Sequence, residues 1–165
     1  MALINESMTS NLDRQKIMDS TTSIQLVRDS YAQDSVRKTV GAGLNQFDRR
    51  FAPELTLEPL VMTAVTSDNT VIGGLVGQLC PDWHWVHIAM LWVAEAYRTQ
   101  GIGRQLLGAA ELEAVRRGCD YVQLETFSYG ARGFYEKQGY VVFGVQEDFP
   151  PGHRRFYLRK NLSTA

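Results

Sequence analysis

Cysteine, histidine and long apolar runs are all scarce in this chain. Of its 165 residues, two are cysteine and three are histidine. Cys80 and Cys119 form no CxxC pair, so we expect two buried thiols in a reducing compartment, with one disulfide as the alternative. The longest apolar run, residues 86–94, is about half of the ~20 residues that a membrane-spanning helix requires, and no signal-peptide pattern opens the chain. These absences predict a cytoplasmic protein without a membrane partner.

An excess of charge of one sign is also missing. The 17 lysine and arginine residues nearly balance the 18 acidic ones, and the net charge is −1. Such a chain has no general attraction for nucleic acid or anionic membranes, so we expect neither as a partner. The hydrophobic fraction of 44% is ordinary for a globular protein, and 165 residues suffice for one domain with a substantial core.

The hydrophobic pattern predicts a polar N-terminal arm followed by one domain. Residues 1–21 hold few large apolar side chains and form the arm. Residues 22–165 form the domain, in which alternating segments predict strands and segments with a period near 3.6 predict helices. Gly41 and Gly43 interrupt the first helical segment, 31–51, and favour two short helices or a kinked one.

The order of the expected elements, β-αα-βββ-α-β-α-ββ, is typical of an α/β protein. It predicts a mixed central β-sheet with helices on both faces. A helix is expected to begin at residue 102 and to stop at the glycine at 118, and a short one is expected at 130–137. The strands are expected at 23–27, 60–66, 71–79, 83–93, 121–126, 140–145 and 155–158.

Residues 98–104, Arg-Thr-Gln-Gly-Ile-Gly-Arg, form a glycine-rich turn between an apolar strand and the helical segment that begins at Ile102. The first N–H groups of a helix have no partner inside it, and the positive end of the helix dipole favours an anion. Gly101 and Gly103 let the backbone approach that anion without a Cβ atom in the way. The turn therefore predicts a site for a phosphorylated ligand.

Two known phosphate motifs do not fit this turn. A dinucleotide-binding fold requires a third glycine where Leu106 stands, and a P-loop requires a Gly-Lys-Ser/Thr sequence that is missing here. The remaining alternative is a helix N-terminus that is rich in glycine and binds nothing.

The neighbouring sequence favours one family. Arg98, Gly101 and Gly103 follow the tripeptide Leu91-Trp92-Val93, and this pattern resembles the acyl-CoA signature of the GNAT superfamily of N-acetyltransferases. A second segment, residues 131–140, resembles the helix and strand that follow the cofactor cleft in that family. Over residues 83–145 the sequence motifs themselves resemble the family, whereas elsewhere only the order of strands and helices does. Further likenesses point to a subgroup of small bacterial members with mostly unassigned substrates.

The resemblance implies that acetyl-CoA is the co-substrate and that its pyrophosphate lies on the N–H groups of residues 100–104. The pantetheine arm would lie between strands 83–93 and 121–126, which splay apart in this family, and would contact the main chain of the first. Ser128 stands where many relatives carry an asparagine that bonds the cofactor. The cofactor-binding residues are expected to be Leu91, Trp92, Val93, Arg98, Gln100, Gly101, Ile102, Gly103, Arg104, Ser128 and Tyr135.

Tyr135 matches the tyrosine that relatives place near the cofactor sulfur. A phenol stays protonated at neutral pH, so this residue would protonate the leaving thiolate as the general acid. The alternative is an aromatic side chain that packs in the core beside Phe134.

The base that deprotonates the acceptor amine has two main candidates. His87 lies near the middle of the expected cleft, on the same face as Trp85 and Leu91, and a hydrogen-bonded core histidine is the alternative. Glu125 lies at the end of the second splayed strand. It would act either as a base through a water molecule or by binding the substrate. His84 and His87 are three apart and face opposite sides of a regular strand, so we expect no metal site. The full set of candidates is His84, His87, Glu125, Glu147, Asp148 and His153.

These residues together predict an N-acetyltransferase that moves acetyl from acetyl-CoA to a primary amine within a ternary complex. The acceptor is expected to be a small molecule: a polyamine, an amino acid derivative or an antibiotic. A non-catalytic acyl-CoA sensor and a protein N-terminal or lysine acetyltransferase are the alternatives. A homodimer is compatible with the family, although no residue of the chain proves it.

Overall fold

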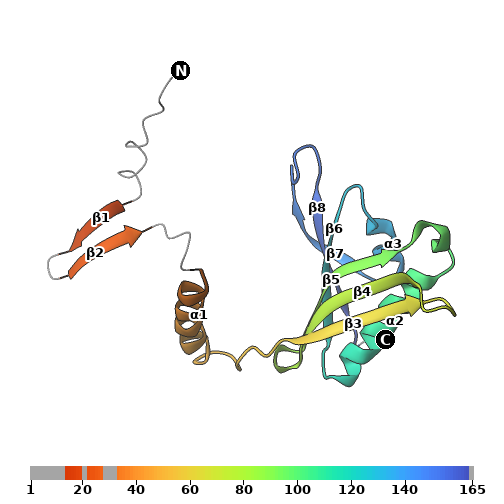
Figure 1. Ribbon diagram of the computed structural model, residues 1–165, viewed down its shortest axis with the longest axis horizontal. Helices are drawn as coiled ribbons and strands as arrows, with labels where there is room; N and C mark the ends of the chain where they lie inside the picture. The colour runs from red at the N-terminus through yellow and green to blue at the C-terminus, as the bar shows by residue number, and fades with distance from the viewer. Residues whose placement is uncertain (1–13, 20–21, 28–32, 164–165) are drawn as a thin grey trace, which may run out of the picture. The chain divides into compact units, whose positions relative to one another are not determined.

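The chain divides into two units, Met1–Ala52 and Pro53–Ala165. The computed structural model describes residues 14–19, 22–27 and 33–163 (Figure 1). In the first unit, β1 (Arg14–Asp19) pairs antiparallel with β2 (Thr22–Val27). The strand predicted at 23–27 is confirmed as β2, whereas β1 lies in the segment that was predicted as a polar arm. Residues 1–13 and 20–21 of that arm lie outside the described residues, and its boundary at residue 21 stays a prediction.

The first unit also contains one helix, α1 (Gln33–Asp48). The helix continues through Gly41 and Gly43, so the alternative of two short helices is wrong. A glycine inside a helix costs about 1 kcal/mol relative to alanine, which weakens the helix without removing any backbone hydrogen bond. Val36, Val40 and Leu44 recur with a helical period and lie on one side of α1, where all three side chains are exposed.

The second unit is built on a six-stranded sheet with the order β3-β4-β5-β6-β8-β7. Only β5 and β6 are parallel, and a parallel pair requires a crossover, which α2 (Ile102–Arg116) supplies. Figure 1 shows α2 crossing one face of β3, β4 and β5, which it contacts. The strands are β3 (Glu58–Val65), β4 (Val71–Cys80), β5 (Trp85–Val93), β6 (Tyr121–Phe127), β7 (Val141–Gln146) and β8 (Arg155–Asn161).

The predicted order of elements holds through this unit, including the short helix α3 (Arg132–Lys137). The strand expected at 83–93 begins two residues later, because Pro81–Trp83 form a short 3-10 helix and His84 adopts a left-handed conformation with φ 56°. The helix that was expected to begin at Ile102 does so, and Gly118 ends it with φ 81°.

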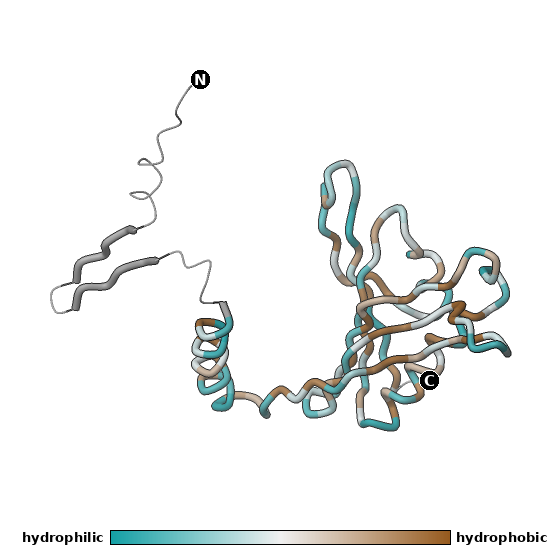
Figure 2. The backbone as a smooth tube through the Cα atoms, viewed as in Figure 1, coloured by the Kyte–Doolittle hydropathy of each residue, from teal (hydrophilic) through white to brown (hydrophobic). Residues whose placement is uncertain are grey.

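The core lies between the sheet and α2. Figure 2 shows apolar segments along the central strands and hydrophilic ones in most of the connecting turns. Cys80 and Cys119 are both free and buried, as expected. Of the helices in the described part of the chain, none is long and apolar enough to span a membrane. The core side chains of α2 are Leu106, Leu107, Ala110 and Ala114, and they join Leu75, Leu79, Val86, Ile88, Val122, Leu124 and Leu158 from the strands.

A β-bulge in β5 changes which side chains face the core. Val76 of β4 pairs with Met90 and the next residue, Gly77, pairs with Ile88, so Ala89 is the extra residue. Before the bulge Ile88 packs in the core, and after it Leu91 does so as well. His87 therefore lies on the opposite face from Leu91, and the prediction that the two share a face is wrong.

Gly77 is required beside this bulge because the two backbones come close together. A Cβ atom at residue 77 would lie 2.5 Å from the carbonyl oxygen of His87. We expect Gly77→Ala to lower the free energy of unfolding by about 1–3 kcal/mol, the usual effect of overpacking, measured by urea denaturation. Gly108→Ala is the control, since a Cβ atom there meets nothing within 4 Å and alanine favours a helix. Equal stability of Gly77→Ala and the parent protein would contradict the close approach.

Candidate active site

A cavity of about 480 Å³ lies where β5 ends and α2 begins. Its walls come from the end of β5, the turn before α2, the first turn of α2, and α3. The volume is in the usual range for a small-molecule site. The cavity is lined by Leu91, Trp92, Val93, Tyr97, Arg98, Thr99, Gly101, Ile102, Gly103, Arg104, Ala131, Phe134 and Tyr135.

The strands beside this cavity separate, as the family resemblance implied. β5 and β6 are paired only where Trp85–Ile88 of β5 lie beside Tyr121–Leu124 of β6. β5 continues to Val93 and β6 continues to Phe127. Beyond the paired segment, the edge of β5 that faces β6 has no strand beside it, and an extended chain with amide groups can hydrogen-bond to such an edge.

The N-terminus of α2 forms the opposite wall of the cavity. Gly101 is the N-cap residue, with φ 82°. The first hydrogen bond of the helix runs from the N–H of Gln105 to the carbonyl of Gly101 at 3.0 Å. The N–H groups of residues 102–104 precede that bond, so they have no acceptor within the helix and can bind an anion.

The side chains of the predicted phosphate turn differ in what they contact. Arg98 Nε donates to the carbonyl of Val93 at 3.1 Å, which ties the turn to the end of β5. Gln100 Nε2 donates to the carbonyl of Ala96 at 3.1 Å, and this side chain is not among those that line the cavity. Arg104 lines both this cavity and a neighbouring one that it shares with Lys137 and Lys160. The turn is therefore basic on the side of Arg104.

Tyr135 lies on α3, is 7% exposed, and lines the cavity. Its ring contacts those of Phe134 and Tyr140, with centroids 5.1 and 5.8 Å away. Burial raises the pKa of the Tyr135 phenol, so the group is neutral at physiological pH. The two interpretations of this residue are compatible, because it packs in the core and also reaches the cavity.

His87 and Glu125 form a pair across the parallel strands. His87 Nε2 lies 2.9 Å from Glu125 Oε2, and both side chains are about one-third exposed, at 36% and 34%. The pair stands where β5 and β6 begin to separate, and neither side chain is among those that line the cavity. A carboxylate that holds one imidazole nitrogen fixes the ring and leaves the other nitrogen free to take a proton. Sequence spacing named both residues but gave no sign that they meet, because their contact depends on the parallel register.

Three of the other candidate bases, His84, His153 and Asp148, have partners of their own. His84 Nδ1 lies 3.1 Å from Asp120 Oδ2, away from His87 and its carboxylate. His153 Nδ1 lies 3.3 Å from the hydroxyl of Ser128. Asp148 Oδ1 accepts the N–H of Gly152 at 2.7 Å in the turn between β7 and β8. Over the described ranges, no group of three or more His, Cys, Asp or Glu side chains could hold a metal ion.

Ser128 has a structural environment that its predicted role did not include. Its N–H donates to the carbonyl of Arg154 at 2.8 Å, and its hydroxyl accepts the N–H of the same residue at 3.3 Å. These bonds join the β6–α3 loop to the start of β8. Ser128 does not line the cavity, and a contact between Ser128 and the cofactor stays a prediction.

Some cavity residues were not identified from the sequence. Tyr97 and Thr99 line the cavity from the turn before α2, and Ala131 and Phe134 line it from the segment around α3. Phe134 and Ala131 belong to the second segment that resembles the family, so position in that segment was the available signal. Tyr97 had no such signal.

The mixed sheet, its splayed parallel pair and the cavity at the N-terminus of α2 agree with the fold that the family resemblance implied. Residues 26–140 match the model of the acetyltransferase (GNAT) family. The chain therefore belongs to the GNAT family of acetyltransferases, and the expected family and fold class are confirmed.

Named acetyltransferases are among the relatives of this chain. It is 35% identical over 117 residues to the blasticidin-S acetyltransferase of Streptomyces morookaense, covering 68% of this chain and 85% of the relative. It is 33% identical over 137 residues to an acetyltransferase of Agrobacterium fabrum, covering 82% and 95%. The crystal structure of an acetyltransferase from Bacillus cereus has a TM-score of 0.73 and 28% identity, covering 82% of this chain and 96% of that one.

Proposed function

We propose that the protein transfers the acetyl group of acetyl-CoA to the primary amine of a small molecule within a ternary complex. The observation that carries this proposal is the cavity of about 480 Å³, which joins the N-terminus of α2 to the buried Tyr135. Acetyl-CoA would supply an acetyl group activated as a thioester. The N–H groups at the start of α2 would hold its pyrophosphate, and the unpaired edge of β5 would hold its amide arm.

The side chains around the splayed strands divide the proton transfers between them. The His87–Glu125 pair takes a proton from the ammonium form of the acceptor, which frees the nitrogen lone pair to attack the thioester carbon. The Tyr135 hydroxyl donates a proton to the sulfur as the carbon–sulfur bond breaks. The nitrogen loses a second proton as the amide forms, and this proton restores the Tyr135 phenol. The products are therefore an amide, a free thiol and one proton that the His87–Glu125 pair releases to solvent. Cys80 and Cys119 take no part, because neither lines the cavity.

The similarity to an antibiotic acetyltransferase supports a small-molecule acceptor. The test is incubation of the protein with acetyl-CoA and a panel of amines, with release of free thiol as the readout. The panel contains blasticidin S, polyamines, amino acid derivatives, and peptides with a free N-terminus or a lysine. Thiol release with small amines alone is the expected result. Release with peptides alone would make the protein a protein acetyltransferase, and CoA binding without turnover across the panel would favour an acyl-CoA sensor.

The phosphate assignment predicts an effect of bulk at Gly101. Gly101→Val should weaken CoA binding roughly 10- to 100-fold, the loss of one hydrogen bond to a charged group, as measured by calorimetry. Gly118→Val is a matched control, because Gly118 has φ 81° against 82° for Gly101 but ends α2 at its other terminus. Both variants carry the same backbone strain. Equal CoA affinity in the two variants would exclude the turn as the phosphate site.

A further inference from the structure

Arg155 is a half-buried cation that has no partner of opposite charge in the described part of the chain. It begins β8 directly opposite Phe127 of β6. Its Nε atom is buried and makes no hydrogen bond. Two cations of this unit have acidic partners, in contrast: Lys160 Nζ lies 2.6 Å from Glu111, and Arg132 Nε lies 2.8 Å from Glu136. Because an unpaired cation loses solvation on burial, Arg155 is the cation most in need of an external anion.

Aromatic rings hold the Arg155 guanidinium in place. Its central carbon lies 4.3 Å from the ring centroid of Phe149 and 5.2 Å from that of Phe127. The turn between β7 and β8 fixes Phe149, whose N–H donates to the carbonyl of His153 at 2.8 Å. Packing against ring faces orients the planar guanidinium without using its N–H groups. The rings thus orient the guanidinium, while its buried Nε atom makes no hydrogen bond.

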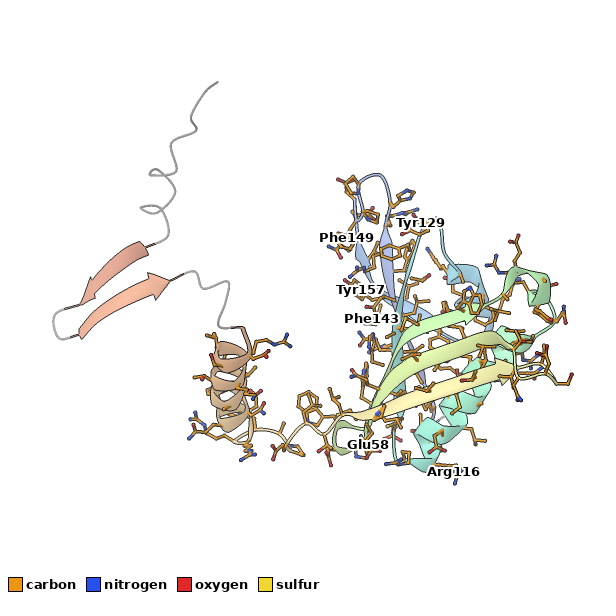
Figure 3. All side chains as sticks on the ribbon, viewed as in Figure 1. Glu58, Arg116, Tyr129, Phe143, Phe149 and Tyr157 are labelled. Carbon is orange, nitrogen blue, oxygen red and sulfur yellow. The ribbon has the colours of Figure 1, made fainter. Side chains whose placement is uncertain are left out.

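The same cluster presents a flat apolar surface beside the guanidinium. The ring of Tyr129 stacks on Phe127 with centroids 5.2 Å apart and an angle of 8° between the planes. Tyr129 is 63% exposed and Phe149 is 39% exposed. Figure 3 shows both side chains at the outer end of the β7–β8 hairpin, with Tyr157 and Phe143 further along it. Exposed aromatic rings around an oriented cation are typical of a ligand site.

The strand register places this cluster next to the proposed base. Glu125 and Phe127 are two residues apart on β6, so their side chains share a face and are separated by about 7 Å along the strand. Glu125 is opposite Tyr157 and Phe127 is opposite Arg155 on β8. An acceptor whose amine lies at the His87–Glu125 pair can therefore place a second group at Arg155.

We propose that Arg155 binds a carboxylate of the acceptor, so that the substrate is an amine that also carries a carboxylate group. This inference rests on the proposed acetyl transfer and narrows its acceptor. A guanidinium fork matches a planar carboxylate through two parallel hydrogen bonds. The amine would lie at His87–Glu125, the carboxylate at Arg155, and the carbon frame on Phe127 and Tyr129. Polyamines, which have no anionic group, are then poor acceptors, and amino acid derivatives are good ones.

The experiment compares matched pairs of amines. A series of ω-amino acids of increasing length is assayed by thiol release, each beside its own carboxamide. For the best chain length, kcat/KM should be roughly tenfold or more higher for the acid than for the amide, since a charged hydrogen-bonded pair is lost in the amide. Arg155→Gln should bring the acid-to-amide ratio of kcat/KM close to one, mainly by raising KM for the acid. Arg155→Lys should restore part of it.

Arg154→Gln is the matched control. Arg154 is the adjacent residue. Its guanidinium carbon lies 5.4 Å from the ring centroid of Phe156, which is buried on the core face of β8. Its removal should leave the acid-to-amide ratio unchanged. Equal use of acid and amide by the parent protein would overturn the proposal. An unchanged acid-to-amide ratio of kcat/KM in Arg155→Gln would also overturn it. This holds even if the variant is less stable, because a loss of folded protein lowers both rates equally and leaves the ratio as it was.

Failure of the proposed function is distinguishable from failure of this site. If no amine releases thiol although CoA binds, acetyl transfer is excluded, and the same pairs are compared by ligand-observed NMR. Binding of the acid that exceeds binding of the amide and is lost in Arg155→Gln would support the carboxylate site. Equal binding of both members would overturn it.

Discussion

Tyr135→Phe should lower kcat by about 10²–10⁴-fold while leaving the affinity for acetyl-CoA nearly unchanged. The substitution removes only the hydroxyl, and the ring still fills its place against Phe134 and Tyr140. Because burial raises the pKa of the Tyr135 phenol, the proton donor stays protonated beyond pH 10. Deprotonation of Tyr135 should therefore cause no loss of activity at any pH below 10. Steady-state kinetics and calorimetry with CoA provide the two measurements.

Tyr140→Phe is the control for this prediction. Tyr140 is also a buried tyrosine, but its hydroxyl donates to Glu111 Oε1 at 2.9 Å, and the residue does not line the cavity. Its loss should reduce stability by about 1 kcal/mol, the usual value of one hydrogen bond, and leave kcat unchanged. A Tyr135→Phe enzyme with the parent kcat would exclude Tyr135 as the acid.

Substitution of the His87–Glu125 pair should have the second large effect. An alkyl amine has a pKa near that of lysine, about 10.4, so at neutral pH the acceptor is almost entirely protonated. His87→Gln should therefore lower kcat/KM by roughly 10²-fold or more at pH 7. The loss should shrink as the pH rises, because more of the amine is then already deprotonated. The measurement is the pH profile of kcat/KM for both proteins.

Glu125→Gln separates the roles within the pair. Glutamine retains the size of the side chain and a hydrogen bond to His87, so a smaller loss than in His87→Gln identifies the imidazole as the base. A loss as large as that of His87→Gln assigns the base to the carboxylate. His84→Gln is the control, since His84 pairs with Asp120 instead. If neither substitution in the pair changes the pH profile, the pair has no part in proton transfer.

The sequence predicted most of the elements because their signals are local. The period of the apolar residues located α2, and Gly118 located its end. The alternation at 23–27 located β2. The strand β1 was not predicted, because most side chains of residues 14–19 are polar. The strand is defined by its backbone pairing with β2. The continuity of α1 was not predicted, since Gly41 and Gly43 lower helix propensity without preventing the helix.

The site was only partly predictable, because some of its contacts depend on register. Gly101 and Gly103 could be identified in the sequence, since a glycine-rich turn before a helix has its physical consequence within a few residues. Ala89 could not be recognised as a bulge. The bulge requires the close approach of Gly77 in the neighbouring strand, and it moves Leu91 to the face opposite His87. A period of two along one strand contains no information about such a shift.

The sequence by itself determined the family, which is confirmed, and it predicted a phosphate turn at Gly101 and Gly103 and Tyr135 as a candidate acid. Each depends on residues close together in the chain, and their spacing is visible without a fold. The tertiary structure decided that His87 meets Glu125 and that the Arg155 guanidinium contacts the rings of Phe127 and Phe149. His87 and Glu125 are 38 positions apart along the chain, and Phe127 and Arg155 are more than 25 positions apart. Only strand pairing, which sets the register of β5, β6 and β8, brings them together.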